Sequence, residues 1–293
     1  MRILILGANG MLGHKLFLYL TRYDEMDVYG TVRNGDGLPN DLPAETKQKI
    51  LLNIDANDFN SIERAIARIK PEMVINCIGI VKQGVLGQDP LACISVNSLL
   101  PHRIAWACQV TGARFLHIST DCVFSGKHGN YTECDLPDAE DIYGRSKLLG
   151  EVNNSNCLTL RTSIIGHELG TQLGLVEWLV NQKNTVLGYE KHIFSGFPTV
   201  ELANIIYHYI IPHEELNGIY HLSSNPISKF ELLNLVAKEY ALKIQVEPNA
   251  DTICDRSLDS SQLRSLIGYA PPDWSEMIAR MHQDYQAAHY LRQ

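Results

Sequence analysis

Short apolar runs alternate with longer stretches of helical spacing through the first half of the chain. The runs at 3–6 and 73–77 are four and five residues long and almost continuously apolar, and the segment 114–119 combines Phe115, Leu116 and Ile118 with polar residues. Runs of this kind are typical of parallel strands buried on both faces. The alternation predicts right-handed βαβ units and a doubly wound parallel α/β sheet. Further strands are predicted at 27–32, 50–53 and 158–161, and helices at 14–20, 60–70, 95–110 and 143–151.

A glycine-rich turn directly follows the first apolar run. Its pattern is G-x-x-G-x-x-G, in which Gly7 permits the tight turn, Gly10 lets the backbone approach a pyrophosphate and Gly13 lets the helix pack on the strand. The pyrophosphate would lie at the helix N-terminus, where unpaired N–H groups favour anions. The turn therefore predicts a dinucleotide cofactor. Its expected contacts are Gly7, Asn9, Gly10, Met11, Leu12 and Gly13.

Arg33 stands at the end of the second predicted strand, twenty residues beyond Gly13. A carboxylate at this place binds the ribose hydroxyls of NAD, whereas a guanidinium suits the 2′-phosphate of NADP. Arg33 therefore favours NADPH, and the nearby Asp36 keeps NADH open. Residues after the third and fourth strands complete the expected cofactor site, with Asp55 near the adenine or its ribose and a flat surface at Cys77, Ile78 and Gly79.

The candidate chemistry comes from Thr120, Tyr143 and Lys147. Tyr143 and Lys147 are four residues apart on a predicted helix, so both side chains share one face. The ammonium would favour the ionised phenol and lower its pKa from about 10. Thr120 follows a strand and can hold a substrate oxygen against the tyrosine. The turn-rich segment between Thr120 and Tyr143 is expected to fold over the site, and Asn97 either braces the active-site backbone or holds a proton-relay water.

After residue 161 the pattern becomes irregular. Helical spacing at 173–182, at 229–240 and from 272 onward is mixed with short strands near 185–187 and 218–222. We expect a dinucleotide-binding domain at 1–161 and a smaller substrate-binding lobe at 162–293, with segments near 193–222 returning to the first domain.

Composition narrows the classes of partner. The chain has 293 residues, 45% of them hydrophobic, and a formal net charge of −8. A net negative charge argues against nucleic acid or an anionic membrane as a partner held by bulk electrostatics. The seven cysteines form no C-x-x-C pair and the histidines no metal-ligand spacing, so we expect reduced thiols and no metal. Neither an export signal nor a membrane span of about 18 apolar residues is recognised, which favours a cytoplasmic protein.

Several motifs together resemble the extended short-chain dehydrogenase/reductase superfamily, and within it the dTDP-4-dehydrorhamnose reductase family. The most specific are S-T-D-C-V-F-S-G at 119–126 and Y-G-R-S-K-L-L-G-E at 143–151. They are accompanied by the glycine turn, Asn97, Tyr131-x-Glu133, R-T-S at 161–163, F-P-T at 197–199, G-I-Y-H-L-S at 218–223 and R-S-L-D-S-S at 256–261. The resemblance covers nearly the whole chain.

The resemblance implies an oxidoreductase that uses NAD(P)H to reduce the 4-keto group of a nucleotide-activated 6-deoxysugar, in polysaccharide biosynthesis of the bacterial type. It implies that Tyr143 protonates the developing alkoxide, that Lys147 binds the nicotinamide ribose and that Thr120 bonds the keto oxygen. A homodimer is possible. The substrate contacts that it implies are Thr120, Asp121, Val123, Phe124, Ser163 and Arg256.

The chain also departs from the family pattern. Cys122 replaces a usual tyrosine, and Ile164 replaces an aromatic residue that packs on the sugar. A related keto-sugar nucleotide is therefore as plausible as dTDP-4-dehydrorhamnose. Two other functions stay open: an epimerase or dehydratase with tightly bound NAD, and a non-catalytic NADP-binding regulatory subunit. Arg33 argues against the former, and the intact Thr120, Tyr143 and Lys147 argue against the latter.

Overall fold

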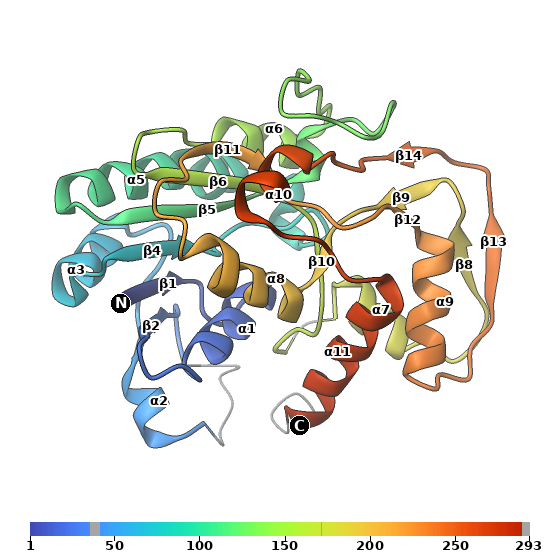
Figure 1. Cartoon of the computed structure of the whole chain (residues 1–293), viewed down its shortest axis with the longest axis horizontal. Helices are drawn as coiled ribbons and strands as arrows, with labels where there is room; N and C mark the ends of the chain where they lie inside the picture. The colour runs from blue at the N-terminus through green and yellow to red at the C-terminus, as the bar shows by residue number, and fades with distance from the viewer. Residues whose placement is uncertain (36–41, 171, 289–293) are drawn as a thin grey trace.

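The computed structural model describes residues 1–35, 42–170 and 172–288. Its centre is a parallel sheet with the strand order β11-β6-β5-β4-β1-β2-β3 (Figure 1). Each neighbouring pair of these strands runs in parallel. The strands are β1 (Arg2–Leu6), β2 (Asp27–Thr31), β3 (Ile50–Leu51), β4 (Met73–Asn76), β5 (Arg114–Thr120), β6 (Cys157–Thr162) and β11 (Gly218–His221).

Helices cover both faces of this sheet, and each face has its own apolar core. On one face, α1 (Met11–Leu20) packs against α8 (Thr199–Ile205), which continues as a π-helical segment, Ile206–Ile210. On the other face, α3 (Phe59–Ile69) packs against α5 (Leu100–Thr111). The helix α6 (Ile142–Leu149) packs on a second π-helical segment, Ile94–Leu99, which precedes α5. This arrangement confirms the predicted doubly wound α/β fold.

A smaller lobe lies at the right of Figure 1, around α9 (Lys229–Glu239). Its short strands form a pair, β8 (Val186–Tyr189) with β13 (Val246–Asn249), and a three-stranded sheet of β12 (Ile227–Ser228), β9 (His192–Phe194) and β14 (Cys254–Asp255). The long helix α11 (Trp274–Ala287) packs against both α8 and α9. The remaining elements are α2 (Ala44–Gln48), α4 (Pro90–Cys93), β7 (Ile164–Ile165), α7 (Leu175–Val180), β10 (Phe197–Pro198), α10 (Ser261–Ile267) and the 3₁₀ turns Val85–Gln88 and Asp121–Val123.

The strand β11 pairs with β6 and completes the main sheet, although it lies far along the chain. The irregular region after residue 161 therefore contributes to the sheet as well as to the smaller lobe. The division at residue 161 stays a prediction.

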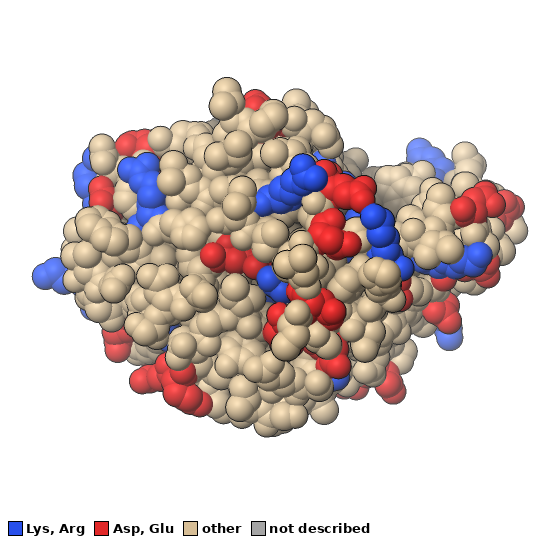
Figure 2. Space-filling model, turned by 90° about the horizontal axis from the view of Figure 1, so that it is seen from above, with Lys and Arg blue, Asp and Glu red and all other residues tan. Residues whose placement is uncertain are grey.

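The surface has no broad patch of one charge on the face that Figure 2 shows, where acidic and basic side chains are interspersed. In the described part of the chain, no helix combines the length and the apolar composition needed to cross a membrane. Nor do three or more His, Cys, Asp or Glu side chains converge as metal ligands within those same residues.

Candidate active site

Thr120 ends β5, in the middle of the sheet, at the edge where parallel strands present their carboxyl ends. The residue is 7% exposed. Its hydroxyl oxygen accepts a hydrogen bond from the Cys122 amide at 3.1 Å and donates to Asp121 Oδ1 at 3.2 Å. The side chain therefore stays fixed at the end of the strand.

The helix α6 carries Tyr143 and Lys147 and packs directly on the segment after Thr120. A Cβ atom at Gly144 would lie 2.2 Å from the carbonyl oxygen of Cys122, so a side chain at this position would push the helix away. A Cβ atom at Gly150 would lie 1.9 Å from the carbonyl oxygen of Asn97. Gly144 and Gly150 thus set how closely α6 approaches its neighbours.

The pKa of the Tyr143 phenol is raised above its ordinary value, which is opposite to the direction that the sequence predicted. Enclosure by protein is the main cause, the neighbouring Cys122 and Asp121 add to it, and a hydrogen bond with Thr120 opposes it. The prediction was wrong because it counted the lysine charge and omitted desolvation. The phenol is therefore a neutral proton donor in this structure.

Lys147 is buried, at 5% exposure, and its Nζ donates to the carbonyl oxygen of Ile118 at 2.7 Å. Burial lowers the pKa of this amine to about 8, and the attraction of Glu151 and Cys77 opposes that decrease. The ammonium thus lies within reach of the β5 backbone, just before Thr120, and loses its proton at a lower pH than an exposed lysine.

The glycine turn joins β1 to α1 with the geometry that a close ligand contact needs. Gly7 has a φ of +82°, and its carbonyl oxygen accepts a hydrogen bond from the Gly10 amide at 3.0 Å. A Cβ atom at Gly13 would lie 2.0 Å from the Gly7 carbonyl oxygen. The N-cap residue of α1 is Gly10, which has no side chain to cap the helix; α1 begins at Met11 and continues through Leu12, and Asn9 precedes it in the turn.

The segment after β4 runs beside this turn. A Cβ atom at Gly7 would lie 3.0 Å from the Ile78 side chain and 3.3 Å from the Cys77 backbone. Asn97, which is 1% exposed, brackets the next residues: its Oδ1 accepts from the Ile80 amide at 2.9 Å and its Nδ2 donates to the Ile80 carbonyl at 3.2 Å. Gly79 packs on the same amide group. Asn97 therefore fixes the backbone beside the turn.

The residues predicted to bind the adenosine end of the cofactor lie after β2 and β3. Arg33 is exposed, and its carbonyl oxygen accepts from the Asn53 amide at 3.1 Å. Asp55 is half-buried and its Oδ1 accepts from the Asn57 amide at 2.9 Å. Asp36 lies outside the described residues.

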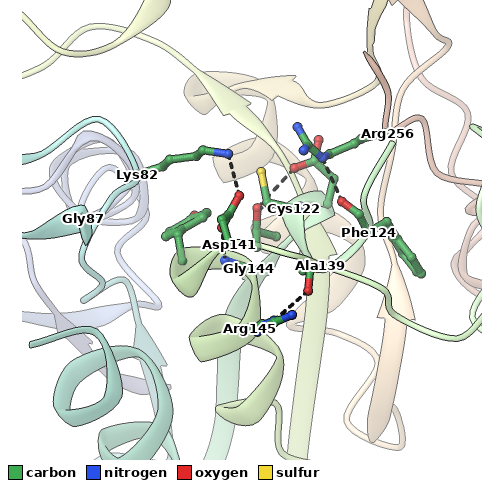
Figure 3. Close-up of polar contacts among 12 residues, drawn as sticks. Lys82, Gly87, Cys122, Phe124, Ala139, Asp141, Gly144, Arg145 and Arg256 are labelled. Carbon is green, nitrogen blue, oxygen red and sulfur yellow. Dashed lines mark hydrogen bonds and ion pairs between the residues drawn. The ribbon is translucent and has the colours of Figure 1, made fainter. Parts of the chain in front are cut away.

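The predicted substrate residues form two groups. Arg256, which is half-buried, donates from Nε to the Phe124 carbonyl oxygen at 2.8 Å (Figure 3) and interacts electrostatically with Asp121. Val123 and Phe124 are fully buried, and the Phe124 ring stacks on Tyr131 at 4.2 Å. Their side chains present no surface to a substrate, because they form a small core that supports the loop after β5.

Ser163 lies between β6 and β7 and is half-buried. Its carbonyl oxygen accepts from the Phe197 amide at 2.8 Å, which ties the end of β6 to β10. The neighbouring Ile164, at the position of the expected aromatic residue, pairs with Phe197 in the short parallel ladder of β7 and β10.

Sequence reasoning missed an ion pair at the start of α6. The Asp141 carboxylate caps the helix by accepting from the Gly144 amide at 2.8 Å, and it also accepts from Lys82 Nζ at 2.6 Å (Figure 3). Burial tends to raise the pKa of Asp141, but these two contacts hold it below its ordinary value. The signal was present, because aspartate is a favoured N-cap residue and Asp141 stands three residues before the amide that it binds.

Fold and site together define the class: a doubly wound nucleotide-binding sheet with threonine, tyrosine and lysine at its carboxyl edge is an extended short-chain dehydrogenase/reductase. The RmlD substrate binding domain family matches residues 1–287. The chain belongs to this family.

Two curated relatives match over most of their length. Methionine adenosyltransferase 2 subunit beta of Rattus norvegicus is 26% identical over 301 residues, covering 92% of this chain and 84% of the relative. The spore coat polysaccharide biosynthesis protein SpsK of Bacillus subtilis (strain 168) is 25% identical over 307 residues, covering 98% of this chain and 99% of the relative.

Solved structures share the fold. A hypothetical dTDP-4-dehydrorhamnose reductase from Sulfolobus tokodaii has a TM-score of 0.77 at 27% identity, covering 94% of this chain and 98% of that one. The dTDP-4-dehydrorhamnose reductase of Bacillus anthracis str. Ames, in complex with NADP, has a TM-score of 0.78 at 24% identity, covering 97% of this chain and 99% of that one.

Proposed function

We propose that this protein reduces the 4-keto group of a nucleotide-activated 6-deoxysugar with NADPH. The observation that carries the proposal is the hydrogen bond between Tyr143 and Thr120 at the carboxyl end of β5, with the Lys147 amine bound to the Ile118 carbonyl oxygen two residues earlier. The reductases from Sulfolobus tokodaii and Bacillus anthracis support the reaction class. The relative SpsK supports a role in polysaccharide biosynthesis.

The proposed chemistry follows from the protonation states of these groups. Tyr143 is a neutral phenol next to Thr120, so it can give its proton to an oxygen that gains negative charge. When substrate binds, the Thr120 hydroxyl would donate to the same oxygen in place of Asp121 Oδ1 and so orient it. Lys147, with a pKa of about 8, is positively charged at neutral pH and stabilises the phenolate that remains.

The residues present fit a dinucleotide cofactor. The turn at Gly7 and Gly10 and the uncapped N-terminus of α1 offer backbone N–H groups to a pyrophosphate. A bound nicotinamide cofactor supplies the hydride. We assign Arg33 to the 2′-phosphate of NADPH and Asp55 to the adenosine end, with Cys77, Ile78 and Gly79 beside the cofactor.

Basic side chains support a phosphate-bearing substrate. Arg256 is anchored through Nε to the Phe124 carbonyl oxygen, which orients its guanidinium. Lys229, the first residue of α9, and Arg256 both interact electrostatically with Asp121 at the site and with His192 in the smaller lobe. We propose that these two cations face the diphosphate of the substrate, with Ser163 near the sugar.

A panel assay tests the proposed function. The purified protein is mixed with several nucleotide-linked 4-keto-6-deoxysugars, including dTDP-4-dehydrorhamnose, and with NADPH or NADH. We expect oxidation of NADPH in equal amount to the keto-sugar consumed, and a product whose C4 configuration identifies the sugar. Absence of turnover with every member of the panel would contradict the proposal.

The second candidate is a non-catalytic subunit of another enzyme. The observation that favours it is the 26% identity to methionine adenosyltransferase 2 subunit beta. This candidate predicts NADPH binding without oxidation by any keto-sugar, together with a stable complex with a second enzyme. An epimerase or dehydratase would instead purify with tightly bound NAD and consume no added NADPH.

A further inference from the structure

A buried carboxylate lies just beyond Lys147 and has no role in the chemistry proposed above. Glu151 follows α6, and its amide donates to the Leu148 carbonyl oxygen at 3.1 Å, so the chain continues its turn past the helix end. The Glu151 side chain is 3% exposed. It is also the last residue of the Y-G-R-S-K-L-L-G-E motif, which the proposed reaction otherwise uses only in part.

Three hydrogen bonds hold this carboxylate. Ser119 Oγ donates to Oε1 at 2.7 Å, Arg161 Nε donates to Oε1 at 2.9 Å and Arg161 Nη2 donates to Oε2 at 2.8 Å. Ser119 and Arg161 are paired residues of β5 and β6. The two-pronged contact with arginine has a defined geometry, so Glu151 ties the ends of both strands to the end of α6.

Arg161 is itself fixed from its other side. Its Nη1 lies 3.3 Å from His221 Nε2, and His221 Nδ1 lies 3.0 Å from the Tyr131 carbonyl oxygen. Because a carbonyl only accepts, Nδ1 carries the ring proton and Nε2 accepts from the guanidinium. Burial lowers the pKa of His221, which keeps the imidazole neutral. The arginine therefore holds the Glu151 carboxylate from a fixed position.

Three consecutive residues of β5 thus connect to the site in different ways. The Ile118 carbonyl oxygen binds Lys147, the Ser119 hydroxyl binds Glu151 and Thr120 carries the hydroxyl assigned to the substrate. We propose that Glu151 is a positioning residue: it fixes Ser119, and with it Thr120, against α6, and it supplies the negative charge that keeps the Lys147 amine protonated. This inference rests on the proposed function.

Lys147 faces titratable groups from three elements: Glu151 after its own helix, Cys77 after β4 and His117 on β5. Burial raises the pKa of the Cys77 thiol to about 12, so it is neutral. Burial also lowers the pKa of His117 well below its usual value, so this imidazole is neutral too. Of these three groups, Glu151 is the one in an ion pair, with its Oε2 2.8 Å from Arg161 Nη2.

The test is the pH profile of turnover in Glu151→Gln. Removing the negative charge lowers the pKa of Lys147, so the decrease of turnover on the alkaline side should move to lower pH, by on the order of one unit. A purely structural role would lower turnover by the same factor at every pH. An alkaline limb that stays in place would overturn the proposal.

Two further variants keep the test decisive. Glu151→Gln combined with Arg161→Gln removes both charges and so avoids an unpaired buried arginine. Its alkaline limb should move in the same direction but by less, because losing the arginine charge raises the pKa of Lys147. Glu201→Gln is the matched control, since Glu201 is 2% exposed and accepts from Arg280 Nη1 at 2.8 Å in a different part of the molecule. The alkaline limb of the pH profile of Glu201→Gln should stay at the pH of the wild type.

A measurement without turnover separates this inference from the proposed function. In protein labelled with ¹³C at lysine Cε, the Lys147 signal is assigned by its loss in Lys147→Met and followed by NMR as pH rises. Its titration should move to lower pH in Glu151→Gln but not in Glu201→Gln. If the wild type reduces no keto-sugar and this movement is still seen, the proposed function fails while the electrostatic role of Glu151 stands. An unmoved titration overturns that role.

Discussion

At the scale of single residues, Tyr143 is the proton donor of the proposed reaction. Replacing it by phenylalanine removes the hydroxyl and keeps the aromatic ring. We expect Tyr143→Phe to lower turnover by roughly 10²–10⁴-fold, which is the usual contribution of a positioned acid, with NADPH affinity nearly unchanged. Steady-state kinetics and NADPH fluorescence titration measure the two quantities, and unchanged turnover would refute the assigned role.

Arg33 is the proposed selector between the two cofactors. The residue is exposed directly after β2, where a guanidinium can meet a 2′-phosphate and a carboxylate would repel it. We expect Arg33→Asp to shift the ratio of kcat/KM for NADPH over NADH towards NADH. Arg68→Asp, an equally exposed change on α3, is the control and should leave the ratio as it is. If the ratio is the same in both variants, Arg33 is not the selector.

At the scale of elements, the start of α6 decides where the tyrosine lies. Asp141 caps this helix and pairs with Lys82 from the loop after β4. We expect Asp141→Ala to lower the free energy of unfolding by about 0.5–2 kcal/mol, and turnover to decrease as well because Tyr143 stands in the first turn of the helix. Chemical denaturation and kinetics give the two results.

The matched control is Asp89→Ala. Asp89 caps α4 by accepting from the amides of Leu91 and Ala92, and α4 carries none of the residues assigned to catalysis. It should lower stability to a similar degree and leave turnover per folded molecule intact. An equal loss of turnover in both variants would argue against a special role of Asp141.

Local pattern was sufficient for the strands and most helices of the main sheet, and insufficient elsewhere. The short runs around β1 and β4 are apolar because both faces of the sheet are covered, and this is readable in the sequence. The helix α8 was not predicted, since its polar residues Thr199 and Glu201 are themselves buried and so do not mark a solvent-facing side of the helix. The strand β3 ends early because Asn53 has a φ of 62°.

The candidate site was predictable in its residue types and less so in its electrostatics. The spacing of Tyr143 and Lys147 and the place of Thr120 follow from pattern alone. The raised pKa of Tyr143 could not be read from the sequence, because desolvation depends on chain segments that meet only after folding. The hydrogen bonds of Glu151 with Ser119 and Arg161 could not be read from the sequence either, because they depend on the register of β5 and β6.

At the scale of the whole molecule, α11 ties the last part of the chain to the cofactor helix. Lys15 of α1 and Asp284 of α11 form an ion pair whose side chains are 5% and 13% exposed. Removing one partner of a buried pair usually costs roughly 3–5 kcal/mol. We expect Asp284→Ala to lower the free energy of unfolding by about this amount and to weaken NADPH binding, because α1 carries the glycine turn.

The control for this prediction is the double variant Lys15→Met with Asp284→Leu. Apolar side chains of similar volume often replace a buried ion pair without loss. The double variant should therefore recover most of the stability in chemical denaturation. A single variant as stable as the wild type would show that α11 does not hold α1 in place.

The small sheets and the oligomeric state could not be predicted from local sequence, because both depend on contacts between residues that are distant in the chain or in different chains. Strands such as β12 and β14 are two residues long, and only their pairing with β9 defines them. No local pattern predicts such contacts. The homodimer likewise stays a prediction, for which light scattering of the purified protein is the direct measurement.

The central claim is that folding brings the Tyr143 phenol, the Lys147 amine and the Thr120 hydroxyl around the reacting ring of a cofactor held at the glycine turn. A crystal structure of the complex with NADPH measures this directly. The account predicts the pyrophosphate at the N-terminus of α1 and the nicotinamide ring in contact with the Tyr143 and Lys147 side chains. A nicotinamide ring bound away from both side chains would contradict it.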